Sequence, residues 1–167
     1  VLRKVFDFDN SEFLNQLKER GFYTAEESRA NYLRTRLSLP SSLNMQYLDF
    51  LTEKLRDSRD TGMVTAMVHG NNLARVLKSI GYRYVLVDSG EPPSNASAMA
   101  DEIVTYSPIA ARELHILMAN TTLAKSMAQR FLIEQFQKRH RYNFQEIQKL
   151  PNAPGPKLVF AHLIIPH

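Results

Sequence analysis

Apolar residues recur at helical spacing in some stretches of the chain and run almost without interruption in others. Apolar positions three or four residues apart predict helices that bury one face. The predicted helices run from Asp9 to Gly21, from Pro40 to Leu55, from Asn72 to Ile80, from Pro108 onward, from Thr122 to Arg141 and from Phe144 to Leu150. Continuous apolar runs predict buried strands at Tyr82–Asp88 and Lys157–Ile165, and residues 22–25 form a short predicted strand.

Polar residues and glycines define the predicted ends of these helices. Asp9 and Glu12 have the spacing of a capping box, and Gly21 follows as a stop signal. Asn71 or Asn72 can cap the third helix, and Gly81 can end it.

The alternation of helices and strands predicts an α/β fold, a layered α/β/α domain with a mainly parallel central sheet. We expect both long strands to be central, because their apolar runs need cover on both faces. Residues 1–167 are interpreted as one domain, with a helical excursion at about residues 98–150. The clearest loop, Ser89–Ser97, follows the carboxyl end of a strand, where open α/β sheets bind ligands.

Composition narrows the function classes. A chain of 167 residues with 44% hydrophobic content can bury a core, and no apolar run approaches the length of a membrane span. The absence of cysteine excludes disulfides, thiolate zinc sites and cysteine nucleophiles. The net charge of +4 indicates anionic partners without identifying one.

Basic and aromatic residues alternate near the end of the helical excursion, as in some nucleic-acid sites. A solvated helix face with an apolar inner side gives the same pattern, and we interpret the stretch in this way. No nucleic-acid partner is therefore expected. The basic residues are Lys125, Arg130, Lys138, Arg139, Arg141 and Lys149.

The densest set of hydroxyl side chains lies in residues 28–44, together with three arginines. Pro40 is favoured at the first position of a helix, so a loop is expected to end near Leu39. Thr35 and Ser38 would then lie just before a helix N-terminus, where a phosphate can bind. The same residues also fit a loop followed by a capped helix, with Ser38 as the cap.

Two segments resemble the alkaline phosphatase–sulfatase superfamily. TRLSLPSSLN is similar to the nucleophile segment, and its Thr-x-x-Ser-x-Pro form is most similar to the phosphoethanolamine and phosphoglycerol transferases of bacterial sulfatase-like proteins. KLVFAHLIIPH resembles the strand that runs into Pro-His. The resemblance implies that Thr35 is the nucleophile and a metal ligand. It also implies that His167, Ser38 and Arg34 bind the substrate, with Arg36 as the alternative arginine.

The implied activity is hydrolysis or transfer of a phosphate or sulfate ester through a covalent phosphothreonine. The implied cofactor is a divalent metal, most commonly Zn²⁺, with Ca²⁺, Mg²⁺ or Mn²⁺ as alternatives. Thr35 cannot become formylglycine and no arginine follows Ser38, so the sulfatase branch fits poorly. The family is often anchored in a membrane with its catalytic domain facing outward.

The resemblance places the other metal ligands outside this sequence. We therefore expect an N-terminal part of a catalytic domain that is soluble, inactive and without a tight zinc site when isolated. Such a part would expose a strand edge or self-associate. The competing interpretation is a non-catalytic basic α/β module that binds an anionic ligand or a protein. His162 is expected in mid-strand as a core or supporting residue, and no histidine has metal-ligand spacing.

Overall fold

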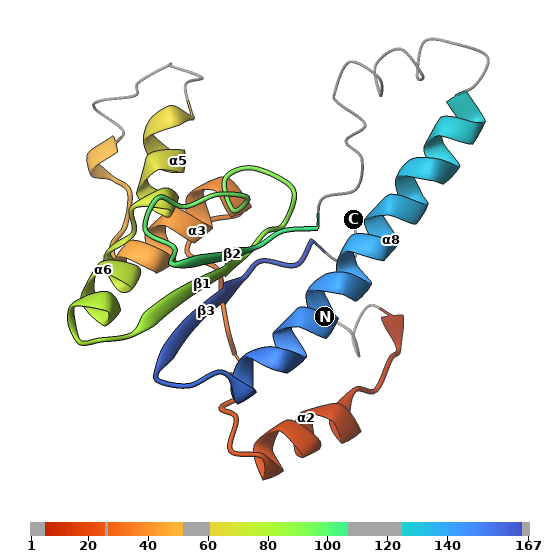
Figure 1. Cartoon of the computed structure of the whole chain (residues 1–167), viewed down its shortest axis with the longest axis horizontal. Helices are drawn as coiled ribbons and strands as arrows, with labels where there is room; N and C mark the ends of the chain where they lie inside the picture. The colour runs from red at the N-terminus through yellow and green to blue at the C-terminus, as the bar shows by residue number, and fades with distance from the viewer. Residues whose placement is uncertain (1–5, 26, 52–60, 107–124, 165–167) are drawn as a thin grey trace. The chain divides into compact units, whose positions relative to one another are not determined.

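The computed structural model describes residues 6–25, 27–51, 61–106 and 125–164 (Figure 1). The chain forms two compact units, residues 1–30 and residues 31–167, and each is described by itself. The predicted helix from Pro108 and the residue His167 lie outside the described residues.

The first unit contains helix α2, Ser11–Glu19. Its N-cap is Asn10, whose side chain makes no capping hydrogen bond, while the Asp9 carboxylate accepts the backbone N–H of Ser11 at 3.0 Å. The predicted capping box was therefore wrong. The carboxylate of Asp9 does satisfy one of the N–H groups that a helix start leaves unpaired.

Helix α2 ends as predicted, but its predicted buried face and the strand predicted after it are absent from the described structure. Gly21 has a positive φ of 82°, and Phe22 N–H returns to the carbonyl of Leu17 at 3.0 Å, which is the Schellman arrangement. The predicted buried face is wrong, because the helix has no buried residue and the side chain of Phe13 is 60% exposed. Residues 22–25 form no strand, since no described strand pairs with them.

The second unit is built on a three-stranded sheet in which all described pairs are parallel. Strands β1 (Arg83–Val87), β2 (Glu102–Val104) and β3 (Lys157–Ala161) lie in the order β2-β1-β3. The predicted α/β fold with a parallel sheet is confirmed. Strand β1 is central as predicted, whereas β3 lies at an edge of the described sheet and is only half-buried along its length.

One face of the sheet is covered by α8, the helix Lys125–Lys149 (Figure 1). Val85 and Val87 alternate onto this face and, with Val104, form a buried cluster. The cluster packs against the end of α8 and the 3-10 turn η1 (Leu150–Asn152) through Tyr142, Ile147 and Leu150. Because α8 is continuous, the predicted break between two helices near residues 141–144 is wrong.

The opposite face carries Tyr84 and Leu86, both buried, and α6 (Asn72–Ser79) contacts β1. The Tyr84 hydroxyl bonds to the side chains of Asn71 and Ser97, and burial raises the pKa of this phenol. Asn71 caps α6 by accepting the Ala74 N–H at 2.8 Å, which confirms the predicted cap. Helices thus cover both faces of the sheet, as the layered prediction required.

The connection from β1 to β2, residues 88–101, must return along the sheet because the two strands are parallel. It ends at Asp101, whose carboxylate accepts the Tyr84 N–H at 2.8 Å and Lys78 Nζ at 2.6 Å. The hydrogen bonds from Lys78 and from the Tyr84 N–H, together with the positive charges of Lys78 and Arg83, lower the pKa of Asp101. Strand β2 lies within residues 98–150, the predicted helical excursion, and no strand was predicted there.

Helices α3 (Thr35–Asn44) and α5 (Gly62–His69) pack together beside α6. Asn44 joins all three: its Nδ2 donates to the carbonyls of Pro40 and Met67, and its Oδ1 accepts the Asn72 N–H. All three distances are between 2.8 and 3.0 Å. A buried amide with its bonds satisfied in this way fixes the mutual position of the three helices.

Helix α3 differs from its prediction at both ends. It begins at Thr35 rather than Pro40, and it ends at Asn44, followed by Met45 in the left-handed region with φ 55°. Pro40 is buried inside the helix, so tertiary packing outweighs the hydrogen bond that proline cannot donate. No helix in the described part of the chain is long and apolar enough to cross a membrane.

Candidate functional site

The start of α3 carries the predicted nucleophile. Thr35 is the first helical residue and is exposed, and Arg34 is the N-cap in an extended conformation, without a side-chain cap bond. Ser38 lies one turn further on, where its N–H bonds to the Arg34 carbonyl at 2.9 Å. The prediction that Ser38 caps the helix is therefore wrong, because its N–H is already inside the helical ladder.

A cavity of about 190 Å³ lies beside this helix start. Its lining includes Arg36 from the first turn of α3, Thr61 and Thr65 from the start of α5, and Pro92 and Pro93 from the loop after β1. Arg36, not Arg34, is the arginine in the cavity wall, and Thr35 is not among the described lining residues. A cation and two helix starts favour an anionic occupant.

The loop after β1 also contains a buried chain of hydroxyl groups. Ser94 is fully buried, and its Oγ lies 2.6 Å from His162 Nδ1 and 2.9 Å from Ser89 Oγ. Ser89 Oγ in turn donates to the Glu91 carbonyl at 2.8 Å. His162 follows the last residue of β3, so it lies at the strand end and not in mid-strand as predicted.

Two further contacts fix the path of this loop. The Asp88 carboxylate accepts the Gly90 N–H at 2.6 Å, and His69 Nε2 bonds to the Pro93 carbonyl at 3.1 Å. His69 is itself held by its own carbonyl, which accepts Ser97 Oγ–H at 2.7 Å. The loop is thus tied at both sides of Pro92–Pro93, which fixes that wall of the cavity.

Helix α8 supports the same loop from the other side. Arg139 Nη1 lies 3.4 Å from the Ser89 carbonyl, and a Cβ at Gly90 would lie 1.1 Å from that nitrogen. Gly90 has a φ of +83°, and this backbone conformation favours glycine, whereas the end of the flexible Arg139 side chain could move to make room for a Cβ. Asn143 is buried and donates to the Asp88 carbonyl at 3.1 Å, while its Oδ1 has no partner among the described residues.

The loop after β1 links the two segments that the sequence analysis identified, the start of α3 and the end of β3. Pro92 and Pro93 line the cavity beside the start of α3, and the next residue, Ser94, bonds to His162 at the end of β3. The sequence predicted a ligand loop after β1 but not the serine–histidine pair. The only signal was the loop itself, because pairing Ser94 with a histidine so far along the chain requires the sheet register.

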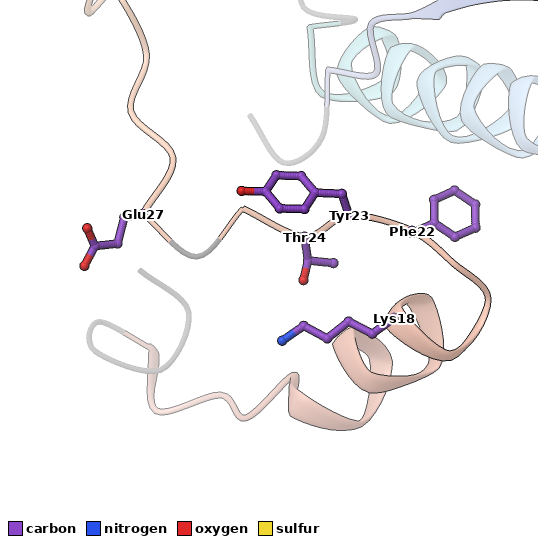
Figure 2. Close-up of a pocket in the computed structure, with 5 residues that line it drawn as sticks. All are labelled: Lys18, Phe22, Tyr23, Thr24 and Glu27. Carbon is purple, nitrogen blue, oxygen red and sulfur yellow. The ribbon is translucent and has the colours of Figure 1, made fainter.

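A second cavity, of about 560 Å³, belongs to the first unit (Figure 2). Lys18 and Thr24 point into the space between α2 and the returning chain, whereas the ring of Phe22 points away. Thr24 Oγ1 is buried without a hydrogen-bond partner, and Tyr23 on the rim is 92% exposed. The described residues that line this cavity include no set of groups suited to catalysis.

The metal implied by the family resemblance can be tested against the donors present. Within the described ranges, no group of three or more His, Asp or Glu side chains could hold a metal ion. A threonine hydroxyl alone does not make a zinc site, which needs three or four ligands. The described residues therefore do not fit a complete metal site.

Comparisons of the chain with family models, curated proteins and solved structures found no match.

Proposed function

We propose that the chain is part of the catalytic domain of a sulfatase-like hydrolase or phosphoalcohol transferase. Its substrate is a phosphate ester, and its nucleophile is the hydroxyl of Thr35. The proposal rests on the two sequence segments that resemble this superfamily. The observation that carries it is the position of Thr35, exposed at the first residue of α3 and next in the sequence to Arg36, which lines the 190 Å³ cavity.

The helix start suits this chemistry for an electrostatic reason. The backbone N–H groups of the first helical turn carry a partial positive charge, which stabilises anions. Arg36 adds a full positive charge and can donate two parallel hydrogen bonds to phosphate oxygens. We therefore assign the phosphate contact to Arg36 in preference to Arg34. Ser38 remains a proposed substrate contact, as does His167.

The reaction has two halves. In the first, the Thr35 oxygen forms a bond to phosphorus, the bond to the leaving alcohol breaks, and that alcohol takes up a proton. In the second, water or an acceptor alcohol attacks phosphorus and the bond to Thr35 breaks. The donors around the phosphate stabilise its equatorial oxygens throughout. A divalent ion would help to ionise the threonine, and its further ligands are not among the described residues.

The competing function is a non-catalytic basic module. Its charge is partly neutralised along α8, where Lys138 pairs with Glu134 at 2.7 Å and Lys149 pairs with Glu146 at 2.5 Å. Exposed pairs of this kind contribute little to binding or stability. No described feature favours this function over ester chemistry, so it serves as the alternative outcome of the test.

The test is to trap the covalent intermediate. The full-length protein is mixed with an aryl phosphate, quenched in acid and digested, and the peptides are mapped by mass spectrometry. We expect phosphate on Thr35 in the natural sequence and in the Thr35→Ser variant at the same position, and none in Thr35→Ala. Phosphate on Ser38 would show that the wrong hydroxyl has been chosen. No release of aryl alcohol above a protein-free control would favour the binding module.

A further inference from the structure

The 190 Å³ cavity formed by α3, α5 and the loop after β1 has an apolar inner wall and a polar mouth. Val64 and Pro93 line it and are buried, and neither side chain can form a hydrogen bond. Arg36 and Thr61 are exposed at its mouth, and Thr65 is partly buried. A ligand that enters the cavity therefore meets polar groups outside and hydrocarbon inside.

The polar side chains that line the cavity have no hydrogen-bond partner among the described residues. Thr61 is the N-cap of α5, yet its hydroxyl makes no capping bond. No hydrogen bond or ion pair within the described ranges involves the side chain of Arg36 or Thr65. Arg83, by contrast, is paired with Glu102 at 2.7 Å. Three side-chain donors at one cavity are thus available to a ligand, and one of them carries a positive charge.

These donors favour a phosphate group over a carboxylate. The guanidinium of Arg36 alone can donate two parallel hydrogen bonds, which match the two oxygens of a carboxylate. A phosphate monoester has a third terminal oxygen and close to a second negative charge, so it can also accept from the hydroxyls of Thr61 and Thr65. Phosphate is therefore the anion that uses all the donors present.

The inner wall favours a short hydrocarbon part in the same ligand. A polar group placed against Val64 and Pro93 would lose its hydrogen bonds to water without replacement. The cavity is smaller than the range of about 300–1,000 Å³ that is typical for drug-sized ligands, so its ligand is small. The Pro93 carbonyl is bonded to His69 Nε2 at 3.1 Å, which fixes this wall.

We propose that the cavity binds a small phosphate monoester, with its phosphate at Arg36, Thr61 and Thr65 and its short hydrocarbon part against Val64 and Pro93. The identification of this ligand as the substrate rests on the proposed function. Binding itself requires no catalytic group, so it is measured separately from turnover.

Binding is measured on the ¹⁵N-labelled 167-residue chain by NMR titration with phosphonates, whose carbon–phosphorus bond resists hydrolysis. Methylphosphonate, ethylphosphonate and propylphosphonate form a series of increasing apolar length. We expect Kd to fall by roughly fourfold for each added methylene, the factor equivalent to about 0.8 kcal/mol. The amide signals of Val64 and Thr65 should shift during the titration. A Kd that does not depend on alkyl length overturns the proposal, as does the absence of these shifts.

Variants of the chain locate the phosphate. Arg36→Gln removes the cationic fork and should raise the Kd of propylphosphonate at least tenfold, equivalent to about 1.4 kcal/mol. Arg141→Gln is the matched control, because it removes the same charge from an exposed side chain on α8 that does not line the cavity. It should change Kd by less than about twofold, because a distant exposed charge is screened by salt. Equal losses in the two variants would show general attraction to a basic chain and contradict the proposal.

Thr65→Val tests the hydroxyl contact with little change of shape. It should raise Kd by roughly fivefold, the factor equivalent to about 1 kcal/mol for one lost hydrogen bond. An unchanged Kd contradicts the position assigned to the phosphate.

The full-length protein separates this inference from the proposed function. Propylphosphonate should inhibit turnover of an aryl phosphate competitively, and Arg36→Gln should weaken the inhibition by the factor measured for binding. Formation of phosphothreonine without phosphonate binding contradicts this inference alone. Arg36-dependent binding without phosphothreonine contradicts the proposed function and the identification of the ligand as substrate, while it supports the phosphate-binding cavity.

Discussion

The two ends of helix α3 differ in exposure and in what their side chains contact. At its start, Thr35 and Arg34 are exposed, and the N-cap side chain makes no capping bond. At its end, Ser41 and Asn44 are buried and fully engaged with neighbouring backbone groups. The same ten residues therefore provide both the proposed reactive surface and a structural anchor.

This difference explains how the proposed nucleophile, Thr35, can be placed accurately without being buried. Ser41 Oγ donates to the Gln46 carbonyl at 2.6 Å and accepts from Asn31 at 2.9 Å, while Asn44 reaches α5 and α6. A helix is stiff over ten residues, so fixing one end also fixes the other. Substitutions at the start should therefore affect turnover, and substitutions at the end should affect stability.

Thr35→Ala should have the largest effect. In the full-length protein we expect turnover to fall by about three powers of ten or more, because the attacking oxygen is lost. The free energy of unfolding should change by less than about 0.5 kcal/mol, because the side chain is exposed. Steady-state kinetics and urea denaturation measure the two quantities. Near-normal turnover would show that the start of α3 does not carry the nucleophile.

Asn44→Ala should give the reverse result. It leaves the carbonyls of Pro40 and Met67 and the N–H of Asn72 without their partner, at a cost of about 2–4 kcal/mol in unfolding free energy. Denaturation of the 167-residue chain measures it. Asn72→Ala is the control, since it removes only an exposed contact with Arg75. Equal losses of unfolding free energy in the two variants would contradict the role of Asn44 as the structural anchor of α3.

Met45→Gly should be a small stabilising change at the same end. Met45 has a left-handed φ of 55°, and Gln46 N–H returns to the Ser41 carbonyl at 3.1 Å, so it occupies the Schellman position usually held by glycine. Glycine removes the Cβ strain, and we expect a gain of about 0.5–1 kcal/mol. Gly81→Ala at the matching position after α6, where φ is +89°, should lose a similar amount. A loss of stability in both variants would show that Cβ strain at positive φ does not explain the effect at Met45.

Asp101→Asn removes an exposed polar contact and should have the smallest effect on the free energy of unfolding. The size of this effect should depend on pH. The hydrogen bonds from Lys78 and the Tyr84 N–H lower the pKa of Asp101. A lowered folded-state pKa stabilises the fold above the unfolded pKa of about 4, and this stability is lost as pH falls through the folded value. Wild type and variant should therefore differ at neutral pH and converge in acid. A constant difference down to about pH 2 would exclude the titration of Asp101 as its cause.

The parts of the fold that could be predicted are those encoded by neighbouring residues. Asn71 caps α6 through a residue three positions away, Gly81 ends it, and β1 is a continuous apolar run. Strand β2 has three residues and no periodic signal, and it exists only because β1 provides hydrogen-bond partners. The start of α3 was wrongly predicted at Pro40, because proline favours a helix start locally, whereas in the structure Pro40 is buried inside the helix.

The candidate site divides in the same way. Thr35 and the loop after β1 were identified from local patterns, and Pro92 and Pro93 of that loop line the described cavity. The contact of Ser94 with His162 could not be identified, because it depends on the pairing of β1 with β3. The choice of Arg36 over Arg34 also needed the actual start of α3, which set the direction of each side chain around the helix.

The order β2-β1-β3 has a consequence for synthesis on the ribosome. Arg83 at the start of β1 pairs with Lys157, which is translated long after it, whereas the partners of β1 in β2 follow within a short connection. A nascent chain can therefore form the β1–β2 pair early but must leave the other edge of its central strand unpaired. Closing that long loop carries the larger entropy cost, so docking of β3 is expected to be the last and slowest step of sheet assembly.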